Sequence, residues 1–258
     1  LLRTLPSPVT SKDNVSVVRE ETDSVPIASA VVFSPDGMLV AYGMDRGNGT
    51  QVVLYDLLTL SVRQTLDTLG DTMIFSHDGQ FLFTGGGSTI AAWEPGSRGL
   101  LWRDEDSEDQ VLHLSASADG RWLAQQGWAT VIIRCARTGV IIRTMRSKDF
   151  EFADVAFSPK SSVLAILKQR SSNLDSDVEL YDLATEEKRV LAYEPSVWSG
   201  GLELLAYSPD GTRLLGIPRY GMPHMWNTQD GQSLPLLELQ AQDGHNQAVA
   251  FSPNGSFW

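Results

Sequence analysis

Cysteine is almost absent from this sequence, since Cys135 is the only one among 258 residues. A single cysteine excludes an intramolecular disulfide and any metal site built from several cysteines. The histidines, His77, His113, His224 and His245, show no HxH or HExxH spacing, which is the kind of spacing that metal ligands need. A G-x-S-x-G nucleophile motif is also lacking. We therefore expect no enzymatic activity, no cofactor and no bound metal.

Long apolar runs and clusters of positive charge are missing as well. No stretch of about 18 apolar residues could span a bilayer, and the N-terminal LLRTLPSPVTSKDNVSV lacks the features of a signal peptide. The 20 Lys and Arg against 32 Asp and Glu give a formal net charge of −12. Such a charge repels phosphate backbones, and no run of Lys or Arg offsets it locally. We expect a cytoplasmic protein that inserts into no membrane and binds no nucleic acid.

The sequence does contain one short turn motif, repeated six times. FSPDG at 33–37 returns as FSHDG, ASADG, FSPKS, YSPDG and FSPNG, with its fifth residue at 37, 79, 120, 161, 211 and 255. The separations of 42, 41, 41, 50 and 44 residues are typical of propeller blades. Proline presets φ at the second turn position and Asp-Gly accommodates a tight reversal, so each copy is expected to join the first two strands of a blade. The fourth copy has Lys160 and Ser161 in place of Asp-Gly, which predicts a looser turn.

Short strands fill the rest of each repeat. Spans such as ASAVVF (28–33) and QFLFTG (80–85) alternate or run apolar, and no helical period occurs. The sequence therefore predicts an all-β fold, a β-propeller of four-stranded antiparallel blades that forms one domain over 1–258. The predicted boundaries place blades at roughly 27–66, 71–103, 110–145, 152–191 and 202–239, a partial sixth blade at 247–258, and a linker or insertion at 6–26.

The two ends of the sequence look like pieces of further blades. LLRTL at 1–5 is similar to IIRTM at 141–145, an expected outer strand, and Phe257 and Trp258 would stop inside the second strand of the sixth blade. These similarities predict that the chain is truncated and that the intact protein has about six or seven blades.

The repeats resemble those of the WD-repeat family of β-propellers, in degenerate form and over nearly the whole chain. The resemblance lies in the FSPDG turns, in Gly244-His245 ahead of Phe251, and in aromatic-polar pairs where the family carries Trp-Asp. These pairs are Tyr55-Asp56, Trp93-Glu94, Tyr181-Asp182 and Trp226-Asn227, while Arg134-Cys135 fills the same slot in the third blade. The resemblance implies buried aromatic residues in the Trp slot. It also implies a non-catalytic scaffold for protein–protein interaction within a larger, multidomain protein.

Two other resemblances leave alternatives open. The first blade, 33–57, is also similar to repeats of the periplasmic Tol-Pal propeller and of prolyl-oligopeptidase-type peptidases. The chain would then be a Tol-Pal-like periplasmic propeller or the non-catalytic propeller of a serine peptidase. A lactonase-like propeller is a further alternative in the enzyme class. A G-x-S-x-G segment in flanking sequence would favour the peptidase, and an upstream secretion signal would favour the Tol-Pal type.

Candidate residues for binding a protein partner lie on one predicted face. In a propeller the loops between blades and those between second and third strands share a face, called here the loop face. The FSPDG turns and the turns between third and fourth strands form the opposite turn face. Because interfaces are enriched in Trp, Tyr and Arg, the candidates on the loop face are Arg46, Trp128, Arg170, Trp198, Arg219 and Tyr220.

An acidic stretch, RDEDSEDQ, lies on the same predicted face between the second and third blades. Its carboxylates are Asp104, Glu105, Asp106, Glu108 and Asp109. Such a run can hold a basic partner peptide or a cation, or it can be a solvated loop without a ligand. Both interpretations remain open at the level of sequence.

Overall fold

The computed structural model describes residues 28–45, 50–97, 99–170, 176–193, 201–235 and 251–252. Within them every regular element is a β-strand, and the strands form five separate four-stranded sheets. Consecutive strands pair antiparallel in every sheet, so each sheet is a meander. The all-β propeller fold of four-stranded antiparallel blades is thereby confirmed. The linker at 6–26, and the partial blade at 247–258 except for 251–252, lie outside the described residues.

The five sheets follow one another along the chain as blades 1 to 5. Blade 1 comprises β1 (Ala28–Phe33), β2 (Leu39–Asp45), β3 (Thr50–Asp56) and β4 (Ser61–Leu66). Blade 2 comprises β5 (Thr72–Phe75), β6 (Leu82–Gly86), β7 (Thr89–Glu94) and β8 (Gly99–Asp104). Blade 3 comprises β9 (His113–Ala116), β10 (Trp122–Gln126), β11 (Thr130–Cys135) and β12 (Ile141–Arg146). Blade 4 comprises β13 (Glu151–Phe157), β14 (Val163–Gln169), β15 (Ser176–Asp182) and β16 (Lys188–Leu191). Blade 5 comprises β17 (Leu202–Tyr207), β18 (Arg213–Pro218), β19 (His224–Asn227) and β20 (Ser233–Leu234).

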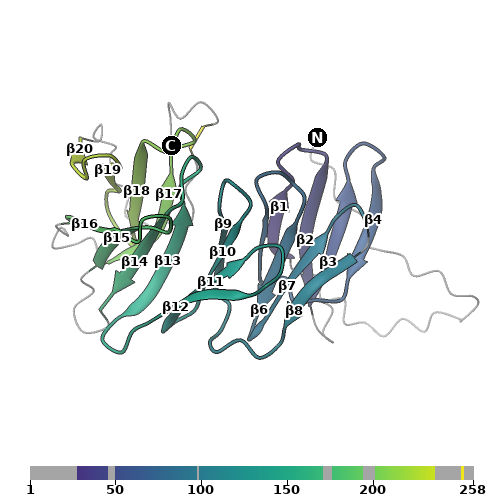
Figure 1. Cartoon of the computed structure of the whole chain (residues 1–258). Helices are drawn as coiled ribbons and strands as arrows, with labels where there is room; N and C mark the ends of the chain where they lie inside the picture. The colour runs from purple at the N-terminus through teal and green to yellow at the C-terminus, as the bar shows by residue number, and fades with distance from the viewer. Residues whose placement is uncertain are drawn as a thin grey trace, which may run out of the picture.

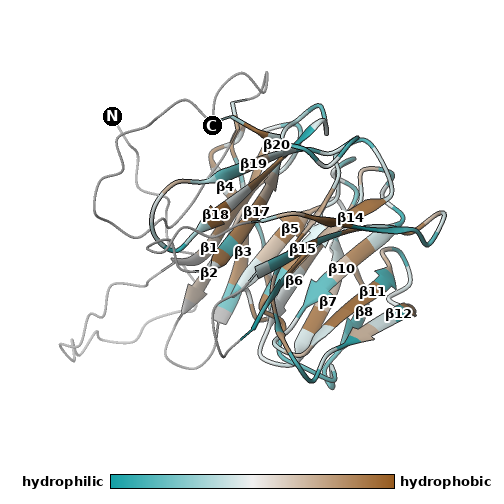
Figure 2. Cartoon of the chain, turned by 90° about the vertical axis from the view of Figure 1, so that its left-hand side faces the viewer, coloured by the Kyte–Doolittle hydropathy of each residue, from teal (hydrophilic) through white to brown (hydrophobic). Residues whose placement is uncertain are grey.

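The first strand of each blade is the innermost one and contacts the first strand of the next blade. These contacts run from β1 to β5, β9, β13 and β17, and the blades stand side by side around an arc (Figure 1). Hydrophobic residues run along the strands while many turns are hydrophilic (Figure 2). The core therefore lies between blades, as where Leu54 of blade 1 packs in one cluster with Met73 and Phe75 of blade 2. Among the described residues no helix is long and apolar enough to cross a membrane.

The repeated turn is held by its serine, its aspartate and its glycine. In blade 5, Ser208 Oγ donates to Asp210 Oδ1 at 2.6 Å and accepts from the backbone N–H of Arg213 at 2.9 Å. Gly211 adopts a φ of 73°, a left-handed conformation that costs glycine little. The same serine–aspartate bond and positive-φ glycine recur in blades 1, 2 and 3. The motif thus closes one hairpin design in four of the five blades.

Proline contributes less to this turn than the sequence predicts. His77 and Ala118 occupy the proline position in blades 2 and 3, yet both turns keep the serine–aspartate bond. In blade 4, Lys160 and Ser161 replace Asp-Gly, and Ser161 is not among the described non-glycine residues with positive φ, which are Leu60 and Glu186. The fourth turn therefore has a different backbone course from the other four.

The aromatic residues of the Trp slot are buried. Tyr55, Trp93, Tyr181 and Trp226 are between 0% and 8% exposed. The indole of Trp226 also donates to the carbonyl of Ala192 at 2.7 Å. These side chains pack inside the blades, in agreement with the resemblance.

Blade 3 fills the same slot with a buried arginine. Arg134 is 2% exposed. Its Nη2 donates to Asp104 Oδ2 at 2.6 Å, its Nε to Gln125 Oε1 at 3.2 Å and its Nη1 to the carbonyl of Gly139 at 3.1 Å. A buried guanidinium needs a counterion and satisfied donors, and Asp104 at the end of β8 supplies that counterion from blade 2.

Candidate functional site

The loop face carries the predicted partner-binding residues that the structure describes. Trp128 lies between β10 and β11, Arg170 follows β14, and Arg219 and Tyr220 follow β18. Because strand direction alternates along each meander, these positions and the β8–β9 loop lie at the same end of their blades. The candidates are spread over blades 3, 4 and 5. Outside the described residues lie Arg46 and Trp198.

The loop that carries Trp128 is fixed from two sides. The Trp128 indole donates to Gln110 Oε1 at 3.3 Å, and the Trp128 carbonyl accepts from the backbone N–H of Phe152 at 2.9 Å. Asp109 Oδ2 accepts from the backbone N–H of Ala129 at 2.8 Å. Trp128 is nevertheless 53% exposed. A large aromatic side chain is therefore presented to solvent from a held backbone.

A hollow lies directly beside Trp128. Its volume is about 440 Å³, and Trp128, Ala129 and residues 147–151 line it. Phe150 forms part of this wall and packs edge-on against Phe152, with ring centroids 5.2 Å apart. Lys148 lies in the same lining. An aromatic wall with charged residues at its edge matches the composition of protein interfaces, which have apolar centres and polar rims. We call this site the Trp128 hollow.

Arg219 is positioned by its own blade. Its Nε donates to Glu203 Oε1 at 2.6 Å, and its backbone N–H donates to the carbonyl of Gly201 at 3.1 Å. The hydrogen bond with Glu203 raises the pKa of Arg219 above its usual range. Surface pairs of this kind contribute little to stability, so the pair orients Arg219 and leaves it accessible.

Two carboxylates of the acidic stretch, Glu108 and Asp109, form hydrogen bonds with segments of blade 3. Glu108 accepts two hydrogen bonds of 2.6 Å from Arg146 of β12, and this interaction with Arg146 lowers the pKa of Glu108. Asp109 closes the Trp128 loop, where it also accepts from the backbone N–H of Thr130 at 3.1 Å. These bonds connect the loop that follows blade 2 to blade 3.

The remaining three carboxylates differ in their surroundings. Asp104 binds the buried Arg134, Glu105 pairs with Arg103 at 3.3 Å, and Asp106 is exposed. In the described part of the chain, no group of three or more His, Cys, Asp or Glu could hold a metal ion. Four of the five acidic side chains thus bind partners within the protein itself, which the sequence pattern did not reveal.

One buried carboxylate ties the innermost strands of three blades together. Asp154 of β13 is 2% exposed. Its Oδ2 accepts from the backbone N–H of Leu205 in β17 at 2.7 Å, and its Oδ1 accepts from that of Val155 at 2.8 Å. Oδ1 also forms an ion pair with Nδ1 of His113 in β9. Burial disfavours the charged imidazolium, but the hydrogen bond and charge of Asp154 outweigh it and raise the pKa of His113.

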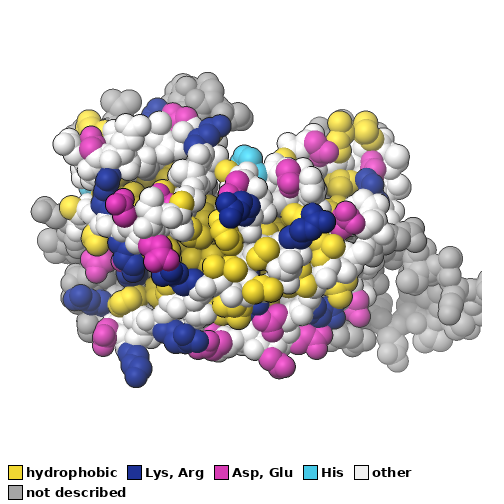
Figure 3. All heavy atoms as spheres, viewed as in Figure 1, with side chains coloured by type: hydrophobic (Ala, Val, Ile, Leu, Met, Phe, Trp, Pro, Cys, Tyr) yellow, Lys and Arg dark blue, Asp and Glu magenta, His cyan; other side chains and the backbone are white. Residues whose placement is uncertain are grey.

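Apolar side chains are exposed on the outermost strands of blades 2 and 3. Figure 3 shows hydrophobic side chains gathered in the middle of one face, with charged residues of both signs around them. Val140, which directly precedes β12, and Ile141 and Ile142 of β12 are between 49% and 59% exposed, and Leu100 of β8 is 45% exposed. Sequence reasoning did not single out these residues, although GLLWR and VIIRTM each contain consecutive apolar residues.

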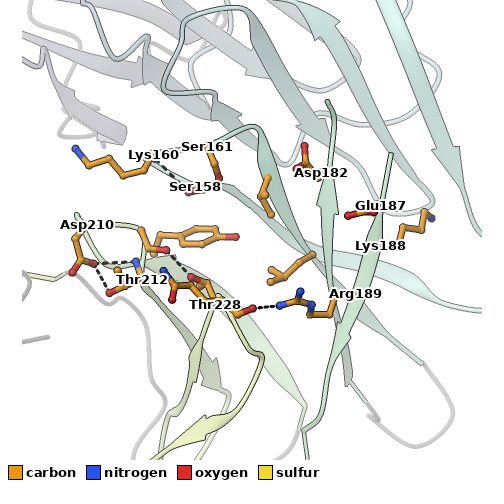
Figure 4. Close-up of a pocket in the computed structure, with 15 residues that line it drawn as sticks. Ser158, Lys160, Ser161, Asp182, Glu187, Lys188, Arg189, Asp210, Thr212 and Thr228 are labelled. Carbon is orange, nitrogen blue, oxygen red and sulfur yellow. Dashed lines mark hydrogen bonds between the residues drawn. The ribbon is translucent and has the colours of Figure 1, made fainter. Parts of the chain in front are cut away.

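A second cavity, on the turn face, was also missed from the sequence. Its volume is about 630 Å³, and it lies between blades 4 and 5. Lys160 and Ser161 of the divergent fourth turn line it (Figure 4). Tyr207 at the end of β17 is also part of the lining. The departure from Asp-Gly was the sequence signal that could have located it.

The fold and these sites describe a WD40-type propeller with two hollowed faces. Among solved structures, hydrazine synthase of Kuenenia stuttgartiensis is similar with a TM-score of 0.70 and 18% identity, over 94% of this chain and 75% of that one. U3-55K is similar with a TM-score of 0.65 and 13% identity, over 84% of this chain and 65% of that one. The WD40 repeats of RRP9 give a TM-score of 0.65 and 14% identity, over 84% and 64%.

These comparisons extend to the fold only. No family model matches the sequence, and no curated protein matches it either. One similar structure is named as an enzyme and another as WD40 repeats, and a shared fold at such identities does not fix function. Any function must therefore be argued from this chain's own surfaces.

Proposed function

We propose that this propeller is a non-catalytic scaffold whose protein partner docks on the loop face at the Trp128 hollow. The exposed and backbone-fixed Trp128 is the observation that carries the proposal. Tryptophan is among the residues that most often dominate binding energy at interfaces. A fixed side chain also loses little conformational freedom on binding.

Arg219 and Tyr220 extend the proposed surface to blade 5. Arg170 belongs to blade 4, which lies between blade 5 and the blade that carries Trp128. Tyr220 is 40% exposed. Tyrosine and arginine are enriched at interfaces together with tryptophan. The proposal that the scaffold is not an enzyme rests on the sequence, which lacks a nucleophile motif and metal-ligand spacing. Its place within a larger multidomain protein rests on the resemblance of its repeats to those of the WD-repeat family.

The test combines partner identification with direct affinity measurement. The protein is used as bait in a cell lysate, captured proteins are identified by mass spectrometry, and each is then purified and titrated against wild type and Trp128→Ala. Central aromatic anchors commonly contribute about 2 kcal/mol or more. We therefore expect Kd to rise about 30-fold or more in Trp128→Ala, with the melting temperature nearly unchanged.

His77→Ala is the matched control on the turn face. Blade 3 carries Ala118 at the same turn position, so the change is compatible with the turn. Binding that survives Trp128→Ala but is lost in His77→Ala would show that the partner uses the opposite face. Turnover of an ester, lactone or peptide substrate by the purified protein would contradict the non-catalytic part of the proposal.

A further inference from the structure

The turn of blade 4 departs from the rule that the other four turns obey. Those turns pair a serine with an aspartate and place glycine at positive φ. In blade 4 the backbone N–H of Lys160 donates to Ser158 Oγ at 3.3 Å. Ser162 Oγ instead donates across to Asp182 Oδ1 at 2.8 Å. Local departures from an otherwise consistent pattern are expected at functional sites.

The cavity between blades 4 and 5 opens beside this turn. Val163 and Leu180 give it an apolar part. Figure 4 shows Asp182 and Glu187 on one side of the cavity and Asp210 on the other. A volume of about 630 Å³ exceeds what one amino-acid side chain fills, so the cavity has room for a side chain and part of its peptide backbone.

Tyr207 places a polar group without a partner in the wall of this cavity. Its hydroxyl is buried and has no hydrogen-bond partner among the described residues. The positions equivalent to Tyr207 in the other blades are Phe33, Phe75, Ala116 and Phe157, none of which carries a hydroxyl. Burial raises the pKa of Tyr207, so the hydroxyl stays protonated at neutral pH. Buried polar groups are nearly always hydrogen-bonded, and an incoming ligand atom would satisfy this one.

The lining carries three acidic residues, Asp182, Glu187 and Asp210, and three basic ones, Lys160, Lys188 and Arg189. Lys188 pairs with Glu179 at 3.1 Å, and Arg189 donates to the carbonyl of Gln229. The third, Lys160, extends away from the cavity (Figure 4). Glu187 is exposed and forms no ion pair with any described residue. The net charge of −12 draws cations to the protein as a whole.

We propose that this cavity binds the side chain of a lysine or arginine presented by a partner peptide. The aliphatic stem packs on Val163 and Leu180, the Tyr207 hydroxyl accepts a hydrogen bond from the cationic head, and Glu187 supplies the opposite charge. This would be a second binding site on the turn face, independent of the Trp128 hollow on the loop face.

The test follows tyrosine signals during titration with small cations. The protein contains only six tyrosines, so labelling with ¹³C at the ring carbon that bears the hydroxyl gives few resonances. Comparison with Tyr207→Phe assigns the signal of Tyr207. The probes are N-acetyl-arginine amide and N-acetyl-lysine amide, with N-acetyl-glutamine amide and N-acetyl-glutamate amide as neutral and anionic counterparts.

We expect the Tyr207 resonance to shift saturably with the arginine or lysine probe and not with the other two. Glu187→Gln should weaken this binding about tenfold, because a hydrogen bond to a charged group is lost. Glu186→Gln is the matched control, since it removes the same charge one position away, where Glu186 pairs with Arg143 outside the cavity. Trp128→Ala should leave the titration unchanged, which separates this site from the proposed loop-face site.

Three outcomes would overturn the proposal. The Tyr207 resonance could fail to shift with either cation, or it could shift with the glutamate probe instead. Equal weakening by Glu187→Gln and Glu186→Gln would show that only the overall charge matters. Tyr207→Phe gives a second measurement by calorimetry, in which the cation should bind more weakly to the variant. The variant should still fold, because phenylalanine already occupies the equivalent positions in blades 1, 2 and 4.

Discussion

Replacing Asp154 with alanine should destabilise the protein more than any other single loss of charge on the innermost strands. The change leaves the buried N–H of Leu205 without its acceptor and removes the partner of His113. A buried donor left unsatisfied costs about 1–3 kcal/mol, and breaking a buried ion pair by removing one partner costs about 3–5 kcal/mol.

These two costs overlap because one carboxylate serves both contacts. The His113 side chain is also 45% exposed, so water screens part of the pair. We therefore expect Asp154→Ala to lower the free energy of unfolding by about 3 kcal/mol. At about 2–4 °C per kcal/mol for a chain of this size, the melting temperature should fall by about 6–12 °C.

Asp154→Asn separates the hydrogen bond from the charge. The amide oxygen of asparagine can still accept from the backbone N–H of Leu205, so the free energy of unfolding should fall by only about 1 kcal/mol. Urea unfolding followed by circular dichroism gives both values. Asp149→Ala, which removes an exposed carboxylate from the loop just before β13, should cost no more than about 0.5 kcal/mol. A loss below about 1 kcal/mol for Asp154→Ala, or equal losses for the two Asp154 variants, would refute the reasoning.

Two further predictions concern buried charge. Because the pKa of His113 is raised in the folded protein, its ion pair contributes stability that is fully present below the unfolded pKa of about 6.5 and is lost as pH rises through the folded pKa. The destabilisation caused by His113→Gln, measured by urea unfolding, should therefore be larger at about pH 6 than at about pH 9, and no difference between the two would contradict the pair. Arg134→Ala should lower the free energy of unfolding by about 2 kcal/mol, less than the loss of a fully buried pair, because Asp104 is 30% exposed and water can solvate it. The double variant Arg134→Met and Asp104→Leu should recover most of that loss. If the double variant is as unstable as Arg134→Ala, the loss of stability does not come from breaking this ion pair.

The repeated elements of the fold were predictable because their causes are local. The serine, aspartate and glycine of each turn act within five residues of one another, so FSPDG located the hairpins directly. The Trp slot was equally readable, since Tyr55, Trp93, Tyr181 and Trp226 follow the same period. The role assigned to proline was too strong, because His77 and Ala118 support the same turn.

The site could be predicted only in outline because its contacts join distant segments. Trp128 was correctly placed on the loop face by topology, but its fixation by Asp109 and Gln110 depends on how blades 2 and 3 meet. The unpaired hydroxyl of Tyr207 depends on which side chains surround it in three dimensions. The ion pair of Arg134 with Asp104 was not predicted either, because it forms only where blade 2 meets blade 3.

The pair of Arg134 and Asp104 also bears on how similar blades find their correct neighbours. The strand register gives the positions equivalent to Asp104 in blades 1 and 4 as Leu66 and Leu191. If blade 3 docked in the same way against blade 1 or blade 4 during folding, Arg134 would be buried against a leucine without this counterion. Repeat proteins are prone to misassembly between similar units, and a charge that is satisfied by one neighbour alone penalises the wrong arrangements. The placement of blade 3 beside blade 2 is thus favoured by a complementary charge pair as well as by the connectivity of the chain.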